Sequence, residues 1–327
     1  MRIQYLYFYP VSKKMQSHSN TIVVIGTGGT IAGVGSSASD HTGYTAAQLG
    51  VAQLVAAVPS LNGAPLEVHQ LAQVDSKDID FGVWRELAQA VAQALARPEV
   101  AGVVVTHGTD TLEETAWFLQ SVLAPSKPVV LTAAMRPATA LSADGPQNLV
   151  DAMTVAAWPG ARGVVAVLCG RVHAAADVRK AHTYQVDAFD SGDAGPVALV
   201  EAGRLRLLRP WPEGQALDWE RVWALEPAAW PWVEIVTSTA GARGEAVRAL
   251  VHAGVRGLVV AGTGNGSIHR DLEAALAEAQ AQGVTVWRAS RCGAGPVLGA
   301  HPRGWPSVGT LTPAKARVAL MLALMPV

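Results

Sequence analysis

The chain has 327 residues, half of them hydrophobic, and a formal net charge of −1 at pH 7. This length is enough for a substantial core and for two domains. The near-neutral charge, without clustered lysines and arginines, argues against nucleic acid as a partner, because a phosphate-binding surface needs concentrated positive charge. No uninterrupted apolar run reaches the length of about eighteen residues that a membrane span requires.

The first twenty residues form a segment of their own character. A secretory signal needs an uninterrupted apolar stretch, but Gln4 and Pro10 break the run here, and Lys13 follows it. We interpret residues 1–20 as a mobile leader, with Met15 as a second candidate start. We therefore expect a soluble cytoplasmic protein.

Cysteine and histidine have no metal or redox spacing. Cys169 and Cys292 lie far apart, so a disulfide framework is not expected, and we expect both to be buried as small hydrophobic residues. The nine histidines are scattered without the spacing of zinc ligands. The sequence therefore predicts no metal and no cofactor.

From residue 21 onward, apolar β-branched runs alternate with helical patterns. Thr111 with Glu114 forms a capping-box pattern that opens one of the helices. The predicted strands cover residues 21–25, 101–106, 128–131 and 163–168, and the predicted helices cover residues 111–123 and 145–157. This alternation favours an α/β fold with a parallel sheet and helices on both faces. We assign residues 21–207 to an N-terminal catalytic domain.

A change in amino-acid composition separates the predicted N-terminal domain from the rest of the chain. Residues 208–231 are rich in Trp, Pro, Glu and Arg without clear periodicity, which is typical of a linker. Alternation then resumes, and Thr312-Pro313 opens a last helix. The predicted strands cover residues 233–236, 257–261 and 284–287, and a helix covers residues 272–280. Residues 232–327 are therefore expected to form a smaller C-terminal α/β domain.

Two predicted strands end in glycine loops that carry threonines. The letters are GTGGTIAG over residues 26–33 and THGTDTLEET over residues 106–115. Ligands bind beyond the carboxyl ends of strands in open α/β sheets, so both loops are expected at one site. A dinucleotide site is excluded by the glycine spacing and by the missing acidic residue downstream, and no phosphate-loop or serine-elbow motif occurs.

A threonine hydroxyl needs a neighbour that takes its proton before it can attack a carbonyl. The chain has only six lysines against nineteen arginines. Lys180 is a candidate because lysine can lose its proton and arginine cannot. Codon bias gives the same ratio, however, and each candidate threonine on its own also fits a turn or a helix cap.

Taken together, the motifs resemble the bacterial L-asparaginase family. Both threonine loops match its two signatures. Further matches are AMRP at 134–137, LSADGP at 141–146, VRK at 178–180, GTGNG at 262–266 and SR at 290–291. They occur in the family order and span roughly residues 20 to 325.

The resemblance implies a reaction and the residues that carry it out. Thr30 would attack the side-chain amide of asparagine to form a β-aspartyl ester, which water then hydrolyses. Tyr44 would assist Thr30. In a second group, Lys180 would draw the proton of Thr109, and Asp110 would hold the substrate ammonium. Backbone amides of the glycine loop can stabilise the developing oxyanion.

The resemblance also implies the remaining binding positions. Ser76 matches the serine that binds the substrate carboxylate. Asn265 matches an asparagine that completes the pocket of a neighbouring subunit, which implies a dimer or tetramer. Lys77 stands where enzymes that also cleave glutamine carry Gln or Glu, and residues 290–300 lack the carboxylate that such enzymes lend to the adjacent site. Selectivity for asparagine is therefore expected.

Three alternatives stay open at the sequence level. A dual glutaminase-asparaginase differs only in pocket residues. The archaeal tRNA-dependent amidotransferase subunit shares the core, but its additional N-terminal domain finds no room in a twenty-residue leader. A non-catalytic module of the same fold would bind aspartate and release no ammonia.

Overall fold

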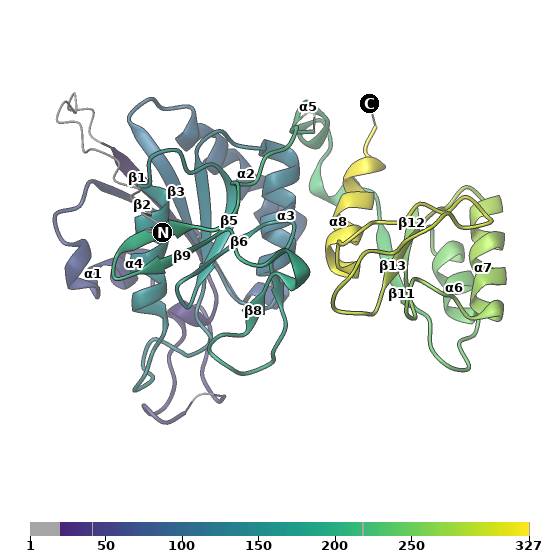
Figure 1. Ribbon diagram of the computed structural model, residues 1–327, viewed down its shortest axis with the longest axis horizontal. Coiled ribbons are helices and arrows are strands. Elements are labelled where there is room, and N and C mark those ends of the chain that lie inside the picture. Colours follow the sequence, from purple (N-terminus) through teal and green to yellow (C-terminus); the bar gives the residue numbers. More distant parts are fainter. Residues whose placement is uncertain (1–19, 41, 218, 327) are drawn as a thin grey trace, which may run out of the picture.

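The computed structural model describes residues 20–40, 42–217 and 219–326, so the predicted leader lies outside the described residues except for Asn20. A larger N-terminal sheet and a smaller C-terminal sheet each carry helices on both faces (Figure 1). The α/β fold predicted from the sequence is thus confirmed. No helix in the described ranges is long and apolar enough to cross a membrane.

The N-terminal sheet, as far as the chain is described, has eight strands in the order β10-β9-β6-β5-β4-β3-β1-β2. The strands are β1 (Thr21–Gly28), β2 (Leu66–Val74), β3 (Val100–Thr106), β4 (Pro128–Thr132), β5 (Gly163–Leu168), β6 (Arg171–Ala174), β9 (Ala198–Glu201) and β10 (Arg204–Leu207). Strands β1 to β5 pair in parallel, whereas β6, β9 and β10 are antiparallel. The predicted parallel sheet is therefore confirmed at its centre and has an antiparallel edge.

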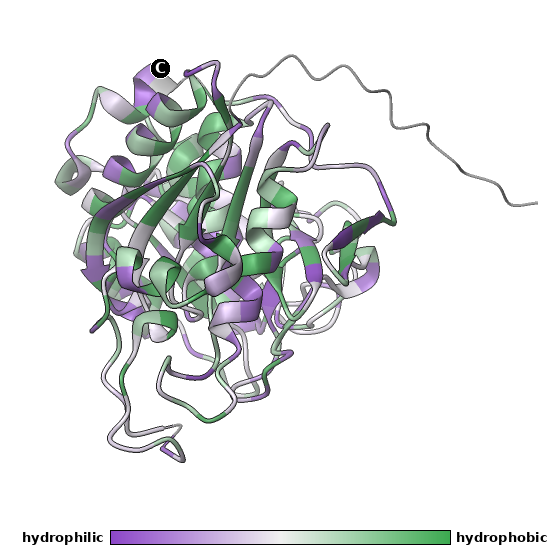
Figure 2. Cartoon of the chain, turned by 90° about the vertical axis from the view of Figure 1, so that its left-hand side faces the viewer, coloured by the Kyte–Doolittle hydropathy of each residue, from purple (hydrophilic) through white to green (hydrophobic). Residues whose placement is uncertain are grey.

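Alternating apolar side chains bury both faces of this sheet. On β1, Val23 and Ile25 join one core, and Ile22 and Val24 join another. One face is covered by α1 (Val51–Ala56) and α4 (Gly145–Ala156), and the other by α2 (Phe81–Leu95) and α3 (Leu112–Leu123). Figure 2 shows how hydrophobic the central strands are. Burial on both faces explains why these strands have continuous β-branched runs.

The C-terminal sheet has the parallel order β11-β12-β13, formed by β11 (Val233–Thr237), β12 (Gly257–Gly262) and β13 (Thr285–Ser290). Helices α6 (Glu245–His252) and α7 (Arg270–Ala281) cover one face, and α8 (Pro313–Ala323) covers the other. Helix α8 lies against α3, as Figure 1 shows. Phe118 of α3 and Val318 of α8 belong to the same core cluster. The two sheets are therefore joined by one continuous hydrophobic core.

Short elements complete the chain. Strands β7 (Arg179–Lys180) and β8 (Phe189–Asp190) form a small antiparallel ladder, and helix α5 (Trp219–Trp223) lies within the predicted linker. Single 3-10 turns occur at Thr30–Ala32, Pro59–Leu61, Ser76–Asp78, Gly192–Ala194 and Pro227–Ala229. The predicted strands and helices all have counterparts in the structure, with ends that shift by a few residues.

The predicted capping box at the start of α3 is wrong. Thr111 is the N-cap residue but its side chain caps nothing, because its hydroxyl donates to the carbonyl of Ser76 at 2.8 Å. Glu114 instead faces Arg317 of α8 at 3.9 Å. Contacts with distant segments therefore take both side chains away from the helix end.

The prediction that both cysteines are buried is also wrong. Cys169 and Cys292 are exposed and free. Cys169 lies in the tight turn between β5 and β6 with φ of 48°, and Cys292 lies in the loop after β13. Connecting segments run over the surface of a protein, which accounts for the exposure of both thiols.

Candidate active site

Three loops meet at the carboxyl ends of β1, β2 and β3. Strand β1 pairs with both β2 and β3, so the segments that follow these strands are neighbours. Thr30 lies in the turn after β1, Ser76 lies in the turn after β2, and Thr109 and Asp110 lie between β3 and α3. The structure therefore brings four of the predicted site residues to one edge of the sheet.

Two glycines allow these loops to touch. A Cβ on Gly108 would lie 2.5 Å from Oγ of Ser76, and a Cβ on Gly29 would overlap the backbone of Gly108. Gly29 also has φ of 81°, a conformation that side chains disfavour. The glycine-rich motifs are therefore needed for close contact between the loops.

Thr30 is paired with Tyr44. Oγ1 of Thr30 lies 2.7 Å from the phenolic oxygen of Tyr44, and Thr30 is only 7% exposed. Tyr44 is held in place by its neighbour Thr45, whose backbone exchanges hydrogen bonds of 3.0 and 2.9 Å with Val34. The predicted nucleophile thus has a second hydroxyl directly beside it, on a loop tied to its own.

Lys180 links the second pair of predicted residues. Its Nζ lies 2.9 Å from Oγ1 of Thr109 and 2.5 Å from Oδ1 of Asp110. Lys180 comes from β7, far along the chain, and its side chain is 20% exposed. A basic amine, a hydroxyl and a carboxylate therefore lie in direct contact, a set of groups that can transfer a proton and bind a cation.

Ser76 ties its turn to the Thr109 loop. Its Oγ accepts the backbone N–H of Asp110 at 3.2 Å, and Ser76 is 1% exposed. Because Oγ accepts this bond, the hydroxyl hydrogen points elsewhere and can be donated to a ligand.

Lys77 and Asn265 have other partners. Lys77 is exposed, and its ammonium pairs with Asp78 and, at 3.4 Å, with Asp75. Asn265 follows β12 in the C-terminal domain; its amide donates to the carbonyl of Leu298 at 3.0 Å and accepts the N–H of Leu298 at 2.7 Å. Within the described ranges, neither side chain is hydrogen-bonded to the threonine pairs.

His107 supports the Thr109 loop from the buried side, in the structural role that the sequence favours for it. Burial lowers the pKa of His107 to about 4, so the ring is neutral at neutral pH. Nδ1 donates to the carbonyl of Gly108 at 2.7 Å, and Nε2 accepts the hydroxyl of Thr115 at 3.0 Å. Trp84 donates in turn to Thr115 at 2.9 Å. This buried chain fixes the loop, and its signal in the sequence is a histidine directly before the glycine.

Asp144 is a second supporting residue without an assigned role. Its carboxylate accepts the backbone N–H groups of Met135 at 2.9 Å and Arg136 at 3.0 Å. The next residues are joined to the first loop, because the N–H of Ala138 donates to the carbonyl of Gly33 at 2.9 Å. The matched segments at 134–137 and 141–146 therefore act together behind the Thr30 loop.

Comparison with known proteins shows the family of this chain. The family model described as "Asparaginase, N-terminal" matches residues 21–213, and the model described as "Glutaminase/Asparaginase C-terminal domain" matches residues 232–325. The chain belongs to the asparaginase family. The resemblance seen in the sequence motifs is thereby confirmed.

Individual relatives cover nearly the whole chain. L-asparaginase 2 of Escherichia coli (strain K12) is 39% identical over 93% of this chain and 88% of that protein. The glutaminase-asparaginase of Pseudomonas fluorescens biotype A is 37% identical over 93% of this chain and 86% of that protein. The crystal structure of a probable cytoplasmic L-asparaginase from Campylobacter jejuni has a TM-score of 0.88 and 37% identity, covering 94% of this chain and 96% of that one.

Proposed function

We propose that this chain is an L-asparaginase that hydrolyses L-asparagine to L-aspartate and ammonia. One observation carries the proposal: two threonine hydroxyls at one sheet edge each have a proton partner, Tyr44 at 2.7 Å from Thr30 and Lys180 at 2.9 Å from Thr109. Family membership and the relatives named L-asparaginase support the same substrate.

The proposed reaction has two halves. Oγ1 of Thr30 bonds to the side-chain amide carbon while its proton passes to the oxygen of Tyr44, and Tyr44 gives its own phenolic proton to the leaving nitrogen. The C–N bond then breaks, and the nitrogen departs as ammonia. In the second half, water attacks the ester, aspartate is released, and Thr30 regains its hydrogen. In this half, Lys180 would accept the proton of Thr109 as the oxygen of Thr109 takes one from the attacking water, and the proton on Lys180 would then restore the hydroxyl of Thr30.

Binding of the substrate would use the groups beside these threonines. Asp110 would hold the substrate ammonium, which then competes with Lys180 for the same carboxylate. Ser76 would donate its hydroxyl hydrogen to the substrate carboxylate. Loop amides around Gly29 would stabilise the negative charge that develops on the carbonyl oxygen of the substrate amide.

Ammonia release from asparagine and from glutamine tests this function. Turnover of asparagine supports it, whereas binding of aspartate without ammonia release would support the non-catalytic module. Comparable kcat/KM values for both substrates would favour the second candidate, a dual glutaminase-asparaginase. The reason to test it is the 37% identity to the glutaminase-asparaginase of Pseudomonas fluorescens biotype A.

Selectivity for asparagine is the first specific prediction. Glutamine is one methylene longer, so its ammonium and carboxylate must shift outward when its amide carbon lies on Thr30. We expect kcat/KM for glutamine to be lower by roughly 100-fold or more. We expect Lys77, the neighbour of Ser76 in the chain, to contribute, because a cation that turns toward the pocket opposes the outward-shifted ammonium of glutamine. The Lys77→Gln variant should therefore have a smaller ratio of kcat/KM for asparagine to kcat/KM for glutamine.

The matched control is Lys127→Gln, which removes a lysine that donates to the carbonyls of Leu95 at 3.1 Å and Arg97 at 2.7 Å. The ratio of kcat/KM values for asparagine and glutamine should stay at its wild-type value in this control. Equal efficiencies in the wild type would contradict selectivity. An unchanged ratio in Lys77→Gln would show that Lys77 does not determine selectivity and that its role is to form ion pairs with Asp75 and Asp78.

We also propose a dimer or tetramer in which Asn265 completes the site of a neighbouring subunit. Thr30→Ala and Asn265→Ala chains should each be inactive alone. Co-expressed in equal amounts, they should regain roughly a quarter of the wild-type activity, since random pairing leaves one intact site in each mixed dimer. Ammonia release and sedimentation measure this. A fully active monomer, or no recovery in proven mixed dimers, would refute the shared site.

The cytoplasm is the proposed compartment. Both cysteines are free and exposed, which is compatible with a reducing environment. The Campylobacter jejuni neighbour is named a probable cytoplasmic enzyme. Fractionation of the cells that produce the protein tests this, and recovery in an extracellular fraction would contradict it.

A further inference from the structure

A lysine of the C-terminal domain lies fully buried where α8 meets the N-terminal domain. Lys315 is 0% exposed, and its ammonium donates to the carbonyl of Ala176 at 2.8 Å and to that of Val178. Burial lowers the pKa of Lys315 to about 8. A buried ammonium persists only where its hydrogens have partners, and here the partners are backbone atoms directly before Lys180.

Glu113 holds the same segment from the other side. Its carboxylate accepts the backbone N–H of Lys180 and the hydroxyl of Thr312, the latter at 3.4 Å. Burial raises the pKa of Glu113, and the positive charge of Lys315 opposes this rise. Glu113 lies in the first turn of α3, which follows the loop of Thr109. The buried Lys315 thus contacts the backbone shortly before Lys180, and the partly buried Glu113 contacts the backbone of Lys180 itself.

The other support of the Lys180 backbone comes from the segment of β8. Ala188 accepts the N–H of Ala181 at 2.7 Å, and Asp190 pairs with Arg179. Strand β7 itself has two residues, and these contacts all lie within the N-terminal domain, so Lys315 supplies the link to the C-terminal domain.

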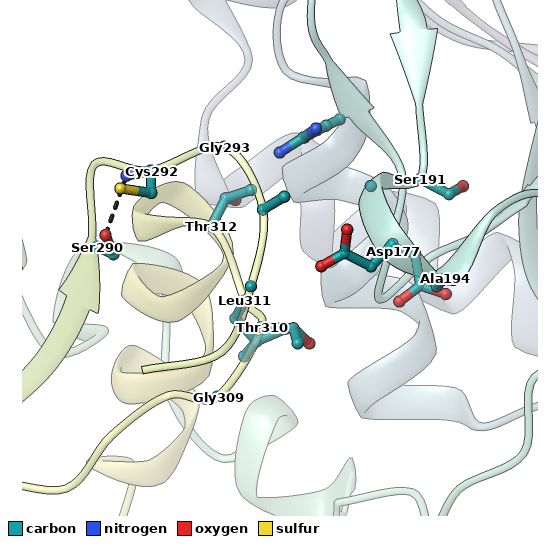
Figure 3. A pocket seen from close by; sticks show the side chains of 15 residues that line it. Asp177, Ser191, Ala194, Ser290, Cys292, Gly293, Gly309, Thr310, Leu311 and Thr312 are labelled. Atoms are coloured by element: carbon teal, nitrogen blue, oxygen red, sulfur yellow. Dashed lines mark hydrogen bonds between the residues drawn. The ribbon is translucent and has the colours of Figure 1, made fainter. Parts of the chain in front are cut away.

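Figure 3 shows Asp177 and Thr312 on opposite sides of a cavity of about 130 Å³ between the domains. A shift of the Lys180 backbone changes how far the side chain must reach to keep Nζ within 2.9 Å of Oγ1 of Thr109 and 2.5 Å of Oδ1 of Asp110.

We propose that Lys315 is a positioning residue for Lys180, through which the C-terminal domain sets the geometry of the Thr109–Lys180 contact. The inference rests on the proposed catalytic role of Lys180. Its physical basis is the steep dependence of rate on distance, since a displacement of about 1 Å can cost roughly 100-fold.

The test compares two variants at the same domain interface. Lys315→Met removes the ammonium and should lower kcat roughly 100-fold with KM within about threefold of wild type. Arg317→Met is the matched control. Arg317 also lies on α8, donates to the carbonyl of Val233 at 3.0 Å and faces Glu114, away from Ala176 and Val178. It should lower the melting temperature and leave kcat within about twofold.

A double variant separates positioning from stability. In Lys315→Met, the carboxylate of Glu113 loses its buried counter-charge, which destabilises the fold. Adding Glu113→Gln removes that charge and keeps an oxygen that accepts the N–H of Lys180. The melting temperature should recover, but kcat should stay low because the carbonyls of Ala176 and Val178 still lack their donor. Recovery of kcat together with the melting temperature would overturn the proposal.

Lys180→Met, measured in parallel, distinguishes the two levels of inference. An inactive Lys180→Met with a fully active Lys315→Met would overturn the positioning role alone. A fully active Lys180→Met would overturn the catalytic role of Lys180 and the positioning role with it.

Discussion

Replacing Thr30 by alanine should lower kcat for asparagine by roughly 10⁴-fold or more, because loss of a covalent nucleophile removes the reaction path. The fold should persist. Thr30 has Tyr44 as its partner at 2.7 Å, and Tyr44 is half-buried, so its phenol can turn to water. Rates of ammonia release and a thermal melting curve measure both effects.

Two variants control this result. Thr30→Ser keeps a hydroxyl and should retain measurable turnover. Thr27→Ala removes another buried threonine hydroxyl, near the end of β1, which donates to the carbonyl of Thr106 at 3.0 Å, so it should lower the melting temperature with far less effect on kcat. A Thr30→Ala enzyme within about tenfold of wild type would contradict the assignment of the nucleophile.

Replacing Lys180 by arginine should lower kcat by roughly 10³-fold or more, although the positive charge is kept. Arginine can still pair with Asp110, which Lys180 contacts at 2.5 Å, but it cannot accept the proton of Thr109. Thr109→Val should cause a similar loss, because it removes the hydroxyl at nearly constant volume. Steady-state kinetics over a range of asparagine concentrations measure both variants.

Lys127→Arg is the matched control for this change. The ammonium of Lys127 donates to the carbonyls of Leu95 and Arg97, directly before β4 and far along the sheet from the site loops. This control should leave kcat unchanged. An active Lys180→Arg enzyme would instead assign Lys180 a structural role.

The central strands could be predicted because burial on both faces leaves a strong pattern. Residues 163–168, for example, are apolar or glycine throughout and form β5 with the predicted bounds. The short antiparallel strands left no such pattern. Strand β10 (Arg204–Leu207) buries one residue of four, and β7 is the dipeptide of Arg179 and Lys180, so neither is long enough to show a period.

The residues of the candidate site also fall into those that could be predicted from the sequence and those that could not. The threonine loops could be found because their glycines are required by close contact, such as that of Gly108 with Ser76. The supports of the site could not be found. Lys315 stands in a helical segment where a lysine is normally interpreted as exposed, and its burial arises only when α8 packs on α3.

The shared core between α3 and α8 bears on how such chains evolve. Two family models divide the sequence near residues 213 and 232, as if each half were a unit that could be exchanged. Phe118 and Val318 nevertheless belong to the same core cluster, so each half presents an apolar face made for the other. Recombination between distant relatives would therefore join surfaces of mismatched shape, and the two halves are under physical pressure to be inherited together.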